Sequence, residues 1–167
     1  MPYLSAAELL ERFCAEEIAQ RADRGIPRRV TAALLSTAAA GGSLAGFTAA
    51  EQEAALAALG LVNAALADAS AQIDGYVATR YRVPLDPAPG SIKRLAGDLA
   101  RYQLYDDAVT ETIQKRRDEA IAELRDIAAG KSVLVDLAGI EPVDAAKAGV
   151  RVSARAPIFD AASLERY

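Results

Sequence analysis

Apolar residues recur at steps of three and four along most of the chain before residue 130, which is the spacing of one face of a helix. Ser5 and Glu8 have the spacing of a capping box, in which a serine oxygen and a glutamate side chain satisfy free amides at the start of a helix. They predict a first helix over about residues 6–21, which ends before Gly25 and Pro27.

A second capping box, at Thr48 and Glu51, begins the longest predicted helix, over roughly residues 49–81. At a rise of 1.5 Å per residue this helix would be about 45–50 Å long. Gly60 and Gly75 lie inside it, and each costs ~1 kcal/mol relative to alanine. We therefore expect each glycine to allow a bend or a close crossing. The apolar stripe of the helix is made of Leu56, Leu59, Val62, Leu66, Ile73 and Val77.

Prolines at 84, 87 and 89 end the long helix and predict a stiff turn. A third helix is then expected over about residues 92–107, with Ser91 as its cap, and a fourth over about 110–129. Gly130 occupies the position of a left-handed C-cap. The third helix is expected to bury Ile92, Leu95, Leu99 and Tyr102 and to carry ion pairs of Asp98 with Arg94 and Arg101.

Two segments lack a clear helical stripe. Residues 24–47 include "AAAGGSLAG" and are interpreted as a mobile connector, although Val30 to Ala40 could form a short helix. In residues 131–167, "KSVLVDL" and "GVRVSAR" alternate apolar with polar positions, which favours extended structure. The predicted organisation is a helical domain over 1–130 with a mobile insertion at 24–47, followed by an extended C-terminal arm over 131–167.

The composition supports helices that approach closely. The chain has 167 residues and 52% hydrophobic residues, but three Phe and no Trp, and much of the apolar content is alanine. We predict an all-α fold: an antiparallel bundle of four or five helices with a long central helix and an extended C-terminal arm.

Candidate catalytic chemistry is sparse. The chain has no histidine and one cysteine, Cys14, so a histidine base and a thiolate metal cluster are both excluded. Asp68 and Asp74 are six residues apart, about 240° around a helix, and do not share a face. A metal-dependent hydrolase built on these two carboxylates and Asp98 is the weakest alternative. We expect no catalytic residue, no cofactor and no metal.

The formal charge of −4 argues against a free-standing nucleic-acid-binding protein, which normally carries a basic surplus. The basic run Lys115–Arg117 lies among Asp118, Glu119 and Glu123, which is typical of a balanced helix face. A small helical regulatory or nucleic-acid-binding protein remains the alternative. No leader opens the chain and no apolar run reaches the ~18 residues that spanning requires, so no membrane association and a cytoplasmic setting are expected.

Four tyrosines lie on either side of the proline turn, on two helices that the turn is expected to bring together. They are Tyr76, Tyr81, Tyr102 and Tyr105. A tyrosine has a flat apolar ring and one hydroxyl that needs a partner when buried. Asp74, Arg80 and Arg101 are candidate partners. The cluster either holds the core of the helical hairpin together or takes part in assembly, and both interpretations remain open.

These residues also carry a family resemblance. The N-terminal elements Tyr3-Leu4-Ser5-Ala6, Glu8-Leu9 and Arg12-Phe13, then Asp74-Gly75-Tyr76, Arg80-Tyr81 and Pro84-Leu85, and then Leu95–Tyr105 with Arg101 and Tyr102, together resemble a family of small Mu-like prophage proteins. The likeness covers most of residues 3–131. Two positions depart from the family pattern, because Arg117 and Glu123 stand where aromatic residues are expected.

The resemblance implies a structural role. These proteins look like the helical head–tail connector, or head-completion, proteins of tailed phages. The implied state is a homo-oligomeric ring in the virion, assembled in the bacterial cytoplasm, with the portal protein on one side and a tail-side adaptor or stopper on the other. DNA would pass through such a ring without sequence-specific binding, and the eight residues Asp74, Tyr76, Arg80, Tyr81, Pro84, Arg101, Tyr102 and Tyr105 would fix the subunit's shape.

Overall fold

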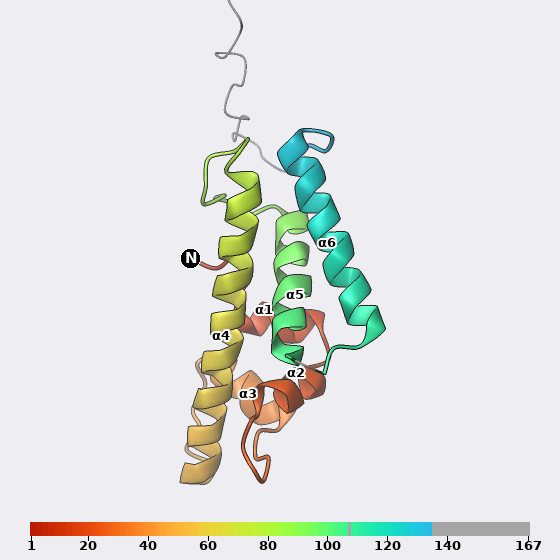
Figure 1. Ribbon diagram of the computed structural model, residues 1–167. Coiled ribbons are helices and arrows are strands. Elements are labelled where there is room, and N and C mark those ends of the chain that lie inside the picture. Colours follow the sequence, from red (N-terminus) through yellow and green to blue (C-terminus); the bar gives the residue numbers. More distant parts are fainter. Residues whose placement is uncertain (107, 135–167) are drawn as a thin grey trace, which may run out of the picture.

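The computed structural model of the protein describes residues 1–106 and 108–134, and this part of the chain is all-helical, with no strands. The all-α prediction is therefore confirmed for these residues, whereas the predicted extended arm lies, from residue 135 on, outside them. The six helices are α1 (Ala6–Arg12), α2 (Ala15–Ala22), α3 (Ala32–Ala39), α4 (Ala49–Val77), α5 (Gly90–Tyr105) and α6 (Glu111–Ala129) (Figure 1).

Helix α4 runs along one edge of the molecule (Figure 1). α5 runs back beside it in the opposite direction, and α6 packs against both. α2 and α3 lie around the N-terminal part of α4, near the C-terminal end of α5, and α1 lies beside the middle of α4 (Figure 1). Both predicted capping boxes are present, at Ser5 with Glu8 and at Thr48 with Glu51. α4 ends at Val77 rather than near residue 81, and its 29 residues span about 43 Å.

The buried face of α4 is built largely from alanine. Ala55, Ala58, Ala65 and Ala69 alternate along it with larger side chains at Val62, Leu66, Ile73 and Val77. This arrangement corrects the predicted stripe in one place, because Leu56 is 59% exposed. Small residues on this face let α5 lie close, which suits a chain with few aromatic side chains to fill space.

The close approach occurs at a glycine other than the two that were expected. A Cβ atom added to Gly97 of α5 would lie 3.1 Å from the ring of Phe13, whereas nothing in the described chain lies within 4 Å of such an atom on Gly60 or Gly75. Of the two roles expected for the α4 glycines, a close crossing is therefore not made within the described residues, and a bend stays a prediction. Their conformational cost is not offset by a contact in the described part of the chain.

The single helix predicted over residues 6–21 is two helices. The chain is extended at Phe13, with φ −118° and ψ 162°, and α2 begins after Cys14. The break places the Phe13 ring beside Gly97 and 5.0 Å under the guanidinium of Arg101. A continuous apolar stripe in the sequence does not reveal such a break, because residues on both sides of it are buried.

Residues 24–47, expected as a mobile connector, contain helix α3 and belong to the packed structure. Thr31 caps α3 by accepting a hydrogen bond from the amide of Leu34, and Leu34 and Leu35 are both buried. The alternative of a short helix within Val30 to Ala40 is the correct one. Two leucines are enough to anchor the segment against α2 and α4.

The termini of the later helices agree with prediction in part. α5 begins at Gly90 with Pro89 at its N-cap, so Ser91 is inside the helix rather than its cap. Gly130 ends α6 in the left-handed conformation, with φ 75°, as predicted. The prolines of the 84–89 turn separate α4 from α5.

By length and composition alone, α4 is apolar enough to cross a membrane, although it holds no uninterrupted apolar run of ~18 residues; the expectation of no membrane association stays a prediction. Alanine, leucine and glycine dominate the helix, so its average hydropathy stays high although single polar residues interrupt the apolar runs. A core helix passes the same test. The buried half of α4 packs on α5, α6, α2 and α3.

Candidate functional site

Tyr3 joins the N-terminal segment to both sides of the proline turn. Its hydroxyl donates a hydrogen bond to the carboxylate of Asp74 and accepts one from the backbone N–H of Leu85 at 3.0 Å. Its own backbone N–H donates to the hydroxyl of Ser70, also at 3.0 Å. Burial and the bond to Asp74 raise the pKa of the Tyr3 hydroxyl to about 12. Asp74, a predicted signature residue, thus pairs with a tyrosine outside the hairpin.

A second set of contacts holds the C-terminal end of α6 against the C-terminal end of α4. Tyr81 is buried, and its hydroxyl accepts a hydrogen bond from the backbone N–H of Leu134 at 3.2 Å. The guanidinium of Arg80 lies against Gly130, so a Cβ atom at that position would overlap it. The cation therefore sits at the carbonyl-rich C-terminus of α6, where positive charge is favourable.

A third contact joins α2 to α5. Arg101 donates two hydrogen bonds to the carboxylate of Glu17, at 2.7 and 2.8 Å, and the hydroxyl of Tyr105 donates to the same carboxylate at 2.6 Å. Arg21 lies 4.2 Å from the centre of the Tyr105 ring. Burial alone would raise the pKa of Glu17, but the bonds from Arg101 and Tyr105 hold that pKa below its ordinary value.

The structure does not bring the eight predicted signature residues together as one cluster. Asp74, Tyr76, Arg80, Tyr81 and Pro84 lie near the proline turn, whereas Arg101, Tyr102 and Tyr105 lie at the far end of α5 (Figure 1). The two helices are antiparallel, so residues late in α5 face the middle of α4 rather than its end. The expected cluster of four tyrosines is therefore wrong, and each group makes its own contacts.

Tyr102 is less buried than the predicted stripe requires. Its side chain is intermediate in exposure, and the guanidinium of Arg117 on α6 lies 5.2 Å from its ring centre. Leu104 and Tyr105 are buried instead. We therefore expect Tyr102→Ala to cost about 1–2 kcal/mol, less than the truncation of a fully buried ring.

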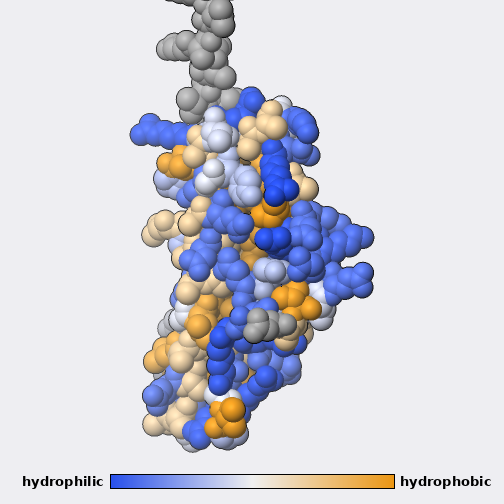
Figure 2. Space-filling view, in the orientation of Figure 1, coloured by the Kyte–Doolittle hydropathy of each residue, from blue (hydrophilic) through white to orange (hydrophobic). Residues whose placement is uncertain are grey.

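The two departures from the family pattern both make contacts with α5. Arg117 lies over Tyr102, and Glu123 accepts a hydrogen bond from Arg94 at 2.6 Å. Arg94 also lies 3.7 Å from Asp98, as predicted, whereas Arg101 pairs with Glu17 instead of Asp98. Burial raises the pKa of Asp98, although Arg94 and other nearby arginines oppose that rise. Hydrophilic side chains consequently gather on the surface over α6 (Figure 2).

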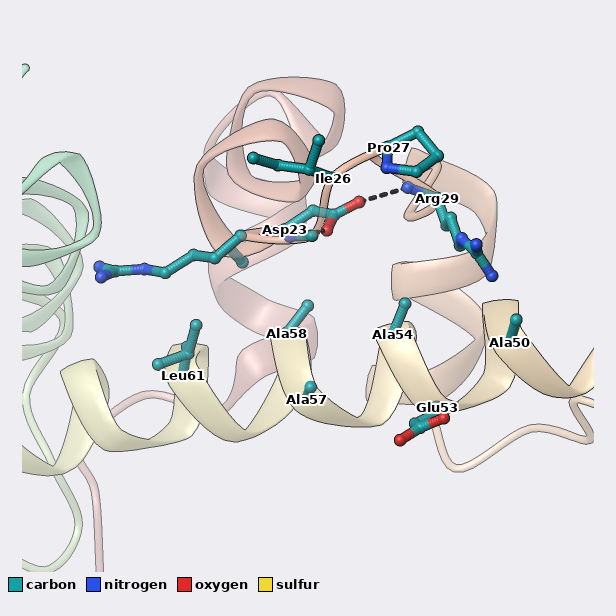
Figure 3. Close-up of a pocket in the computed structure, with 13 residues that line it drawn as sticks. Asp23, Ile26, Pro27, Arg29, Ala50, Glu53, Ala54, Ala57, Ala58 and Leu61 are labelled. Atoms are coloured by element: carbon teal, nitrogen blue, oxygen red, sulfur yellow. Dashed lines mark hydrogen bonds between the residues drawn. The ribbon is translucent and has the colours of Figure 1, made fainter.

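A groove of about 420 Å³ lies between α4 and the loop that follows α2 (Figure 3). Asp23 shapes the loop by accepting hydrogen bonds from the backbone N–H groups of Gly25, Arg29 and Val30, at 2.9, 2.5 and 2.8 Å. Burial would raise the pKa of Asp23, but these three bonds lower it. The floor of the groove is the alanine-rich side of α4, and Ile26 in the loop is fully exposed.

A second groove, of about 680 Å³, lies near the proline turn. Its walls come from the N-terminal segment and from residues 84–88, and they are mainly apolar, with Met1, Pro2, Pro84, Leu85 and Pro87 among them. The ion pair of Glu8 with Lys93, at 2.7 Å, lies at its side. The two grooves are therefore found toward opposite ends of α4.

Asp23, Glu17 and Tyr3 were missed as shape-determining residues. A signal existed for Asp23, because Asp-x-Gly is typical of a turn in which the side chain accepts backbone amides. No local pattern marks Glu17 or Tyr3, since their partners are 84 and 71 residues away. Residues 1–106 and 108–134 contain no group of three Asp, Glu, Cys or His side chains that could hold a metal ion. The expectation of no enzymatic activity stays a prediction.

Comparison with known proteins gives a family match over most of the chain. The family model described as "Bacteriophage Mu, Gp36" matches residues 3–153. Two curated relatives are similar over a shorter part: gene product J of Escherichia phage Mu is 38% identical over 68 residues, which is 41% of this chain and 48% of that protein. The Mu-like prophage FluMu protein gp36 of Haemophilus influenzae is 35% identical over 69 residues, which is 41% of this chain and 49% of the relative. The chain thus spans about half the length of the curated relatives it matches.

Proposed function

Because this chain belongs to the bacteriophage Mu Gp36 family, we propose that it is a structural protein of a tailed phage or prophage particle, and that it acts as a head–tail connector. In this role copies of the chain form a ring that joins the portal protein of the head to a tail-side adaptor or stopper. The protein is made in the bacterial host and resides in the virion.

The observation that carries the proposal is the position of the two grooves. A connector needs a docking surface toward each neighbour, and the described chain has one apolar groove near the proline turn and another beside the first half of α4. The helix between them is about 43 Å long. Apolar surface that is exposed and bordered by polar groups is typical of protein–protein contact.

The polar side chains support the same role from inside the subunit. Tyr3, Glu17 and Arg80 hold the N-terminal segment, α2 and α6 against the α4–α5 pair. These contacts preorganise the subunit's shape, which lowers the ordering cost of assembly. In the proposal, the described residues supply shape rather than catalysis, and DNA passes through the ring without being read, as the charge of −4 favours.

Deletion of the gene from an inducible phage or prophage tests the proposal. We expect electron micrographs of induced lysates to show DNA-filled heads and separate tails, and plasmid-borne protein to restore joined particles. Immunogold labelling of complemented particles should place the protein at the junction of head and tail.

Two results would contradict the connector role. One is normal joined particles in the deletion strain. The other is loss of early phage transcription together with sequence-selective binding of the purified protein to phage DNA, which would establish the regulatory alternative. The complementing plasmid is also tested with Glu17→Gln, which removes the anionic partner of Arg101, and with the exposed control Glu16→Gln. A loss of joined particles with Glu17→Gln but not with Glu16→Gln would be due to a change in the subunit's shape.

A further inference from the structure

Two neighbouring apolar residues at the end of the described chain differ in exposure. Leu134 is buried and its backbone N–H donates to the hydroxyl of Tyr81, whereas Val133 is 58% exposed. Successive side chains of an extended segment point to opposite faces. The sequence predicts extended structure here, in "KSVLVDL", so Val135 and Leu137 are expected on the same face as Val133. That face is apolar and points away from the helices that bury Leu134.

The apolar groove near the proline turn lies at the same end of the molecule. Its volume is about 680 Å³, and Leu85 in its wall is four positions from Tyr81, which holds Leu134. In Figure 1 the N-terminus, which contributes Met1 and Pro2 to the groove, lies on one side of α4, and α6, which leads to Leu134, lies on the other. One subunit therefore has an apolar segment and an apolar groove at one level but on different sides.

We propose that residues 133–137 of one copy of the chain bind in the groove of the next copy, with the side chains of Val133, Val135 and Leu137 inside it. This proposal rests on the connector role, because it places the copies in a ring. Copies in a ring are related by rotation about one axis, so a segment and a groove at the same level of the subunit meet between neighbours. Each copy then provides one segment and one groove, and a closed ring leaves neither unused.

A single contact of this kind is weak. So short a segment buries far less than the ~800 Å² per partner of a standard stable interface. In a ring the last contact closes within the assembly, which raises the effective concentration of its two parts. We therefore expect the contact in assembled rings, and in the free protein only at high concentration.

Disulfide trapping of the full chain tests the contact. The exposed Cys14 is first replaced by serine, and one cysteine is placed in the groove, as Ala88→Cys, and one in the segment, as Leu137→Cys. In glutathione buffer at millimolar chain concentration, we expect linked dimers and larger multimers on non-reducing gels, in amounts that grow with concentration. Val135→Asp in this background should lower the linked fraction about fivefold or more, because a carboxylate would have to be buried in the groove. Val150→Asp, outside the segment, is the matched control and should leave it unchanged.

Two results with the free chain would overturn the proposal. One is a disulfide within a single chain, which keeps the mass at 17.5 kDa and would mean that the segment binds the groove of its own subunit. The other is a linked fraction no higher than in a chain with Ala122→Cys in place of Ala88→Cys, since Ala122 is exposed on α6 and outside the groove.

Particles complemented with the trapping variant separate this contact from the connector role. Oxidation of such particles should give a ladder of linked subunits. Particles that hold the protein at the junction of head and tail but give no ladder would contradict the contact alone. Particles without the protein would contradict the connector role, and the trapping of the free chain would still decide whether segment and groove bind each other.

Discussion

Glu17 is the side chain on which the contact between α2 and α5 depends. Its side chain is 23% exposed and accepts hydrogen bonds from both Arg101 and Tyr105. We expect Glu17→Gln to lower the free energy of unfolding by about 2 kcal/mol, because Arg101 keeps its charge and loses its anionic partner. Chemical denaturation at pH 7 measures this difference. Glu16→Gln, one residue away and exposed, should stay within ~0.5 kcal/mol.

The same pair predicts a pH dependence. The folded-state pKa of Glu17 is below its ordinary value of 4.5, so the stabilisation is complete above pH 4.5 and is lost as pH falls through the folded-state pKa. The difference in stability between wild type and Glu17→Gln should therefore shrink as the pH falls below 4.5. A difference that stayed constant from pH 7 to pH 3 would show that the carboxylate charge does not contribute.

Gly130 and Gly41 form a natural pair of test positions. Both have positive φ, at 75° and 70°, but only the former has the Arg80 guanidinium against it, while nothing lies within 4 Å of a Cβ atom at Gly41. We expect Gly41→Ala to cost about 1 kcal/mol of conformational strain and Gly130→Ala about 2–3 kcal/mol. Thermal and denaturant unfolding would measure both.

A double-mutant cycle tests whether Arg80 causes the larger loss of stability that is expected for Gly130→Ala than for Gly41→Ala. If the overlap is the cause, Arg80→Ala should reduce the cost of Gly130→Ala to that of Gly41→Ala. Equal costs at the two glycines in the wild-type background would mean that Arg80 moves aside freely.

At the residue scale, the sequence predicted the helix caps, which depend on residues a few positions apart, but it did not predict side-chain contacts between residues far apart in the sequence. The capping residues Ser5 and Thr48 and the C-cap Gly130 follow from patterns within a few residues of each other. Tyr3 and Glu17 could not be identified, because a hydrogen bond across 71 or 84 residues leaves no periodic trace. Exposure was also misjudged at Leu56 and Tyr102, since both fit an apolar spacing yet lie at the edge of their helix faces.

At the scale of elements, alanine controls the distance between α4 and α5. Ala69 is fully buried on α4, and Ala96 and Ala100 are buried on α5. We expect Ala69→Leu to destabilise the protein by about 1–3 kcal/mol through overpacking. Ala122→Leu, exposed on α6, should change stability by less than ~0.5 kcal/mol. Denaturant midpoints that moved equally for the two variants would argue against tight packing between these helices.

The ends of a helix were predictable from the sequence where the signals for them lie within the same stretch of the chain. α4 begins where predicted, at its capping box, and α6 ends where predicted, at the left-handed Gly130. The break between α1 and α2 and the packing of α3 were not predictable. Phe13 and Leu35 take their conformations from the neighbours they meet, and those neighbours come from other helices.

At the scale of the whole molecule, the helical domain extends at least to Leu134. Leu134 is buried and bonds to Tyr81, so it belongs to the helical domain, beyond the boundary predicted at residue 130. We expect a chain ending at Leu134 to keep the helical circular dichroism and melting temperature of the full protein, but to fail to restore joined particles. A chain ending at Gly130 should also melt at lower temperature. Full complementation by the longer truncation would remove residues 135–167 from the proposed role.

The long-range bonds of Tyr3 have a consequence for biosynthesis. Its partners Asp74 and Leu85 follow it by 71 and 82 positions, and the chain is made from the N-terminus at ~5–20 residues per second. After Tyr3 has been added to the nascent chain, about 4–16 seconds pass before Leu85 is added. During that interval Leu4, Leu9 and Leu10, all buried in the finished protein, have no α5 to cover them. The leucines beside Tyr3 are thus synthesised several seconds before the helix that covers them, so they stay exposed in the nascent chain until α5 has been made.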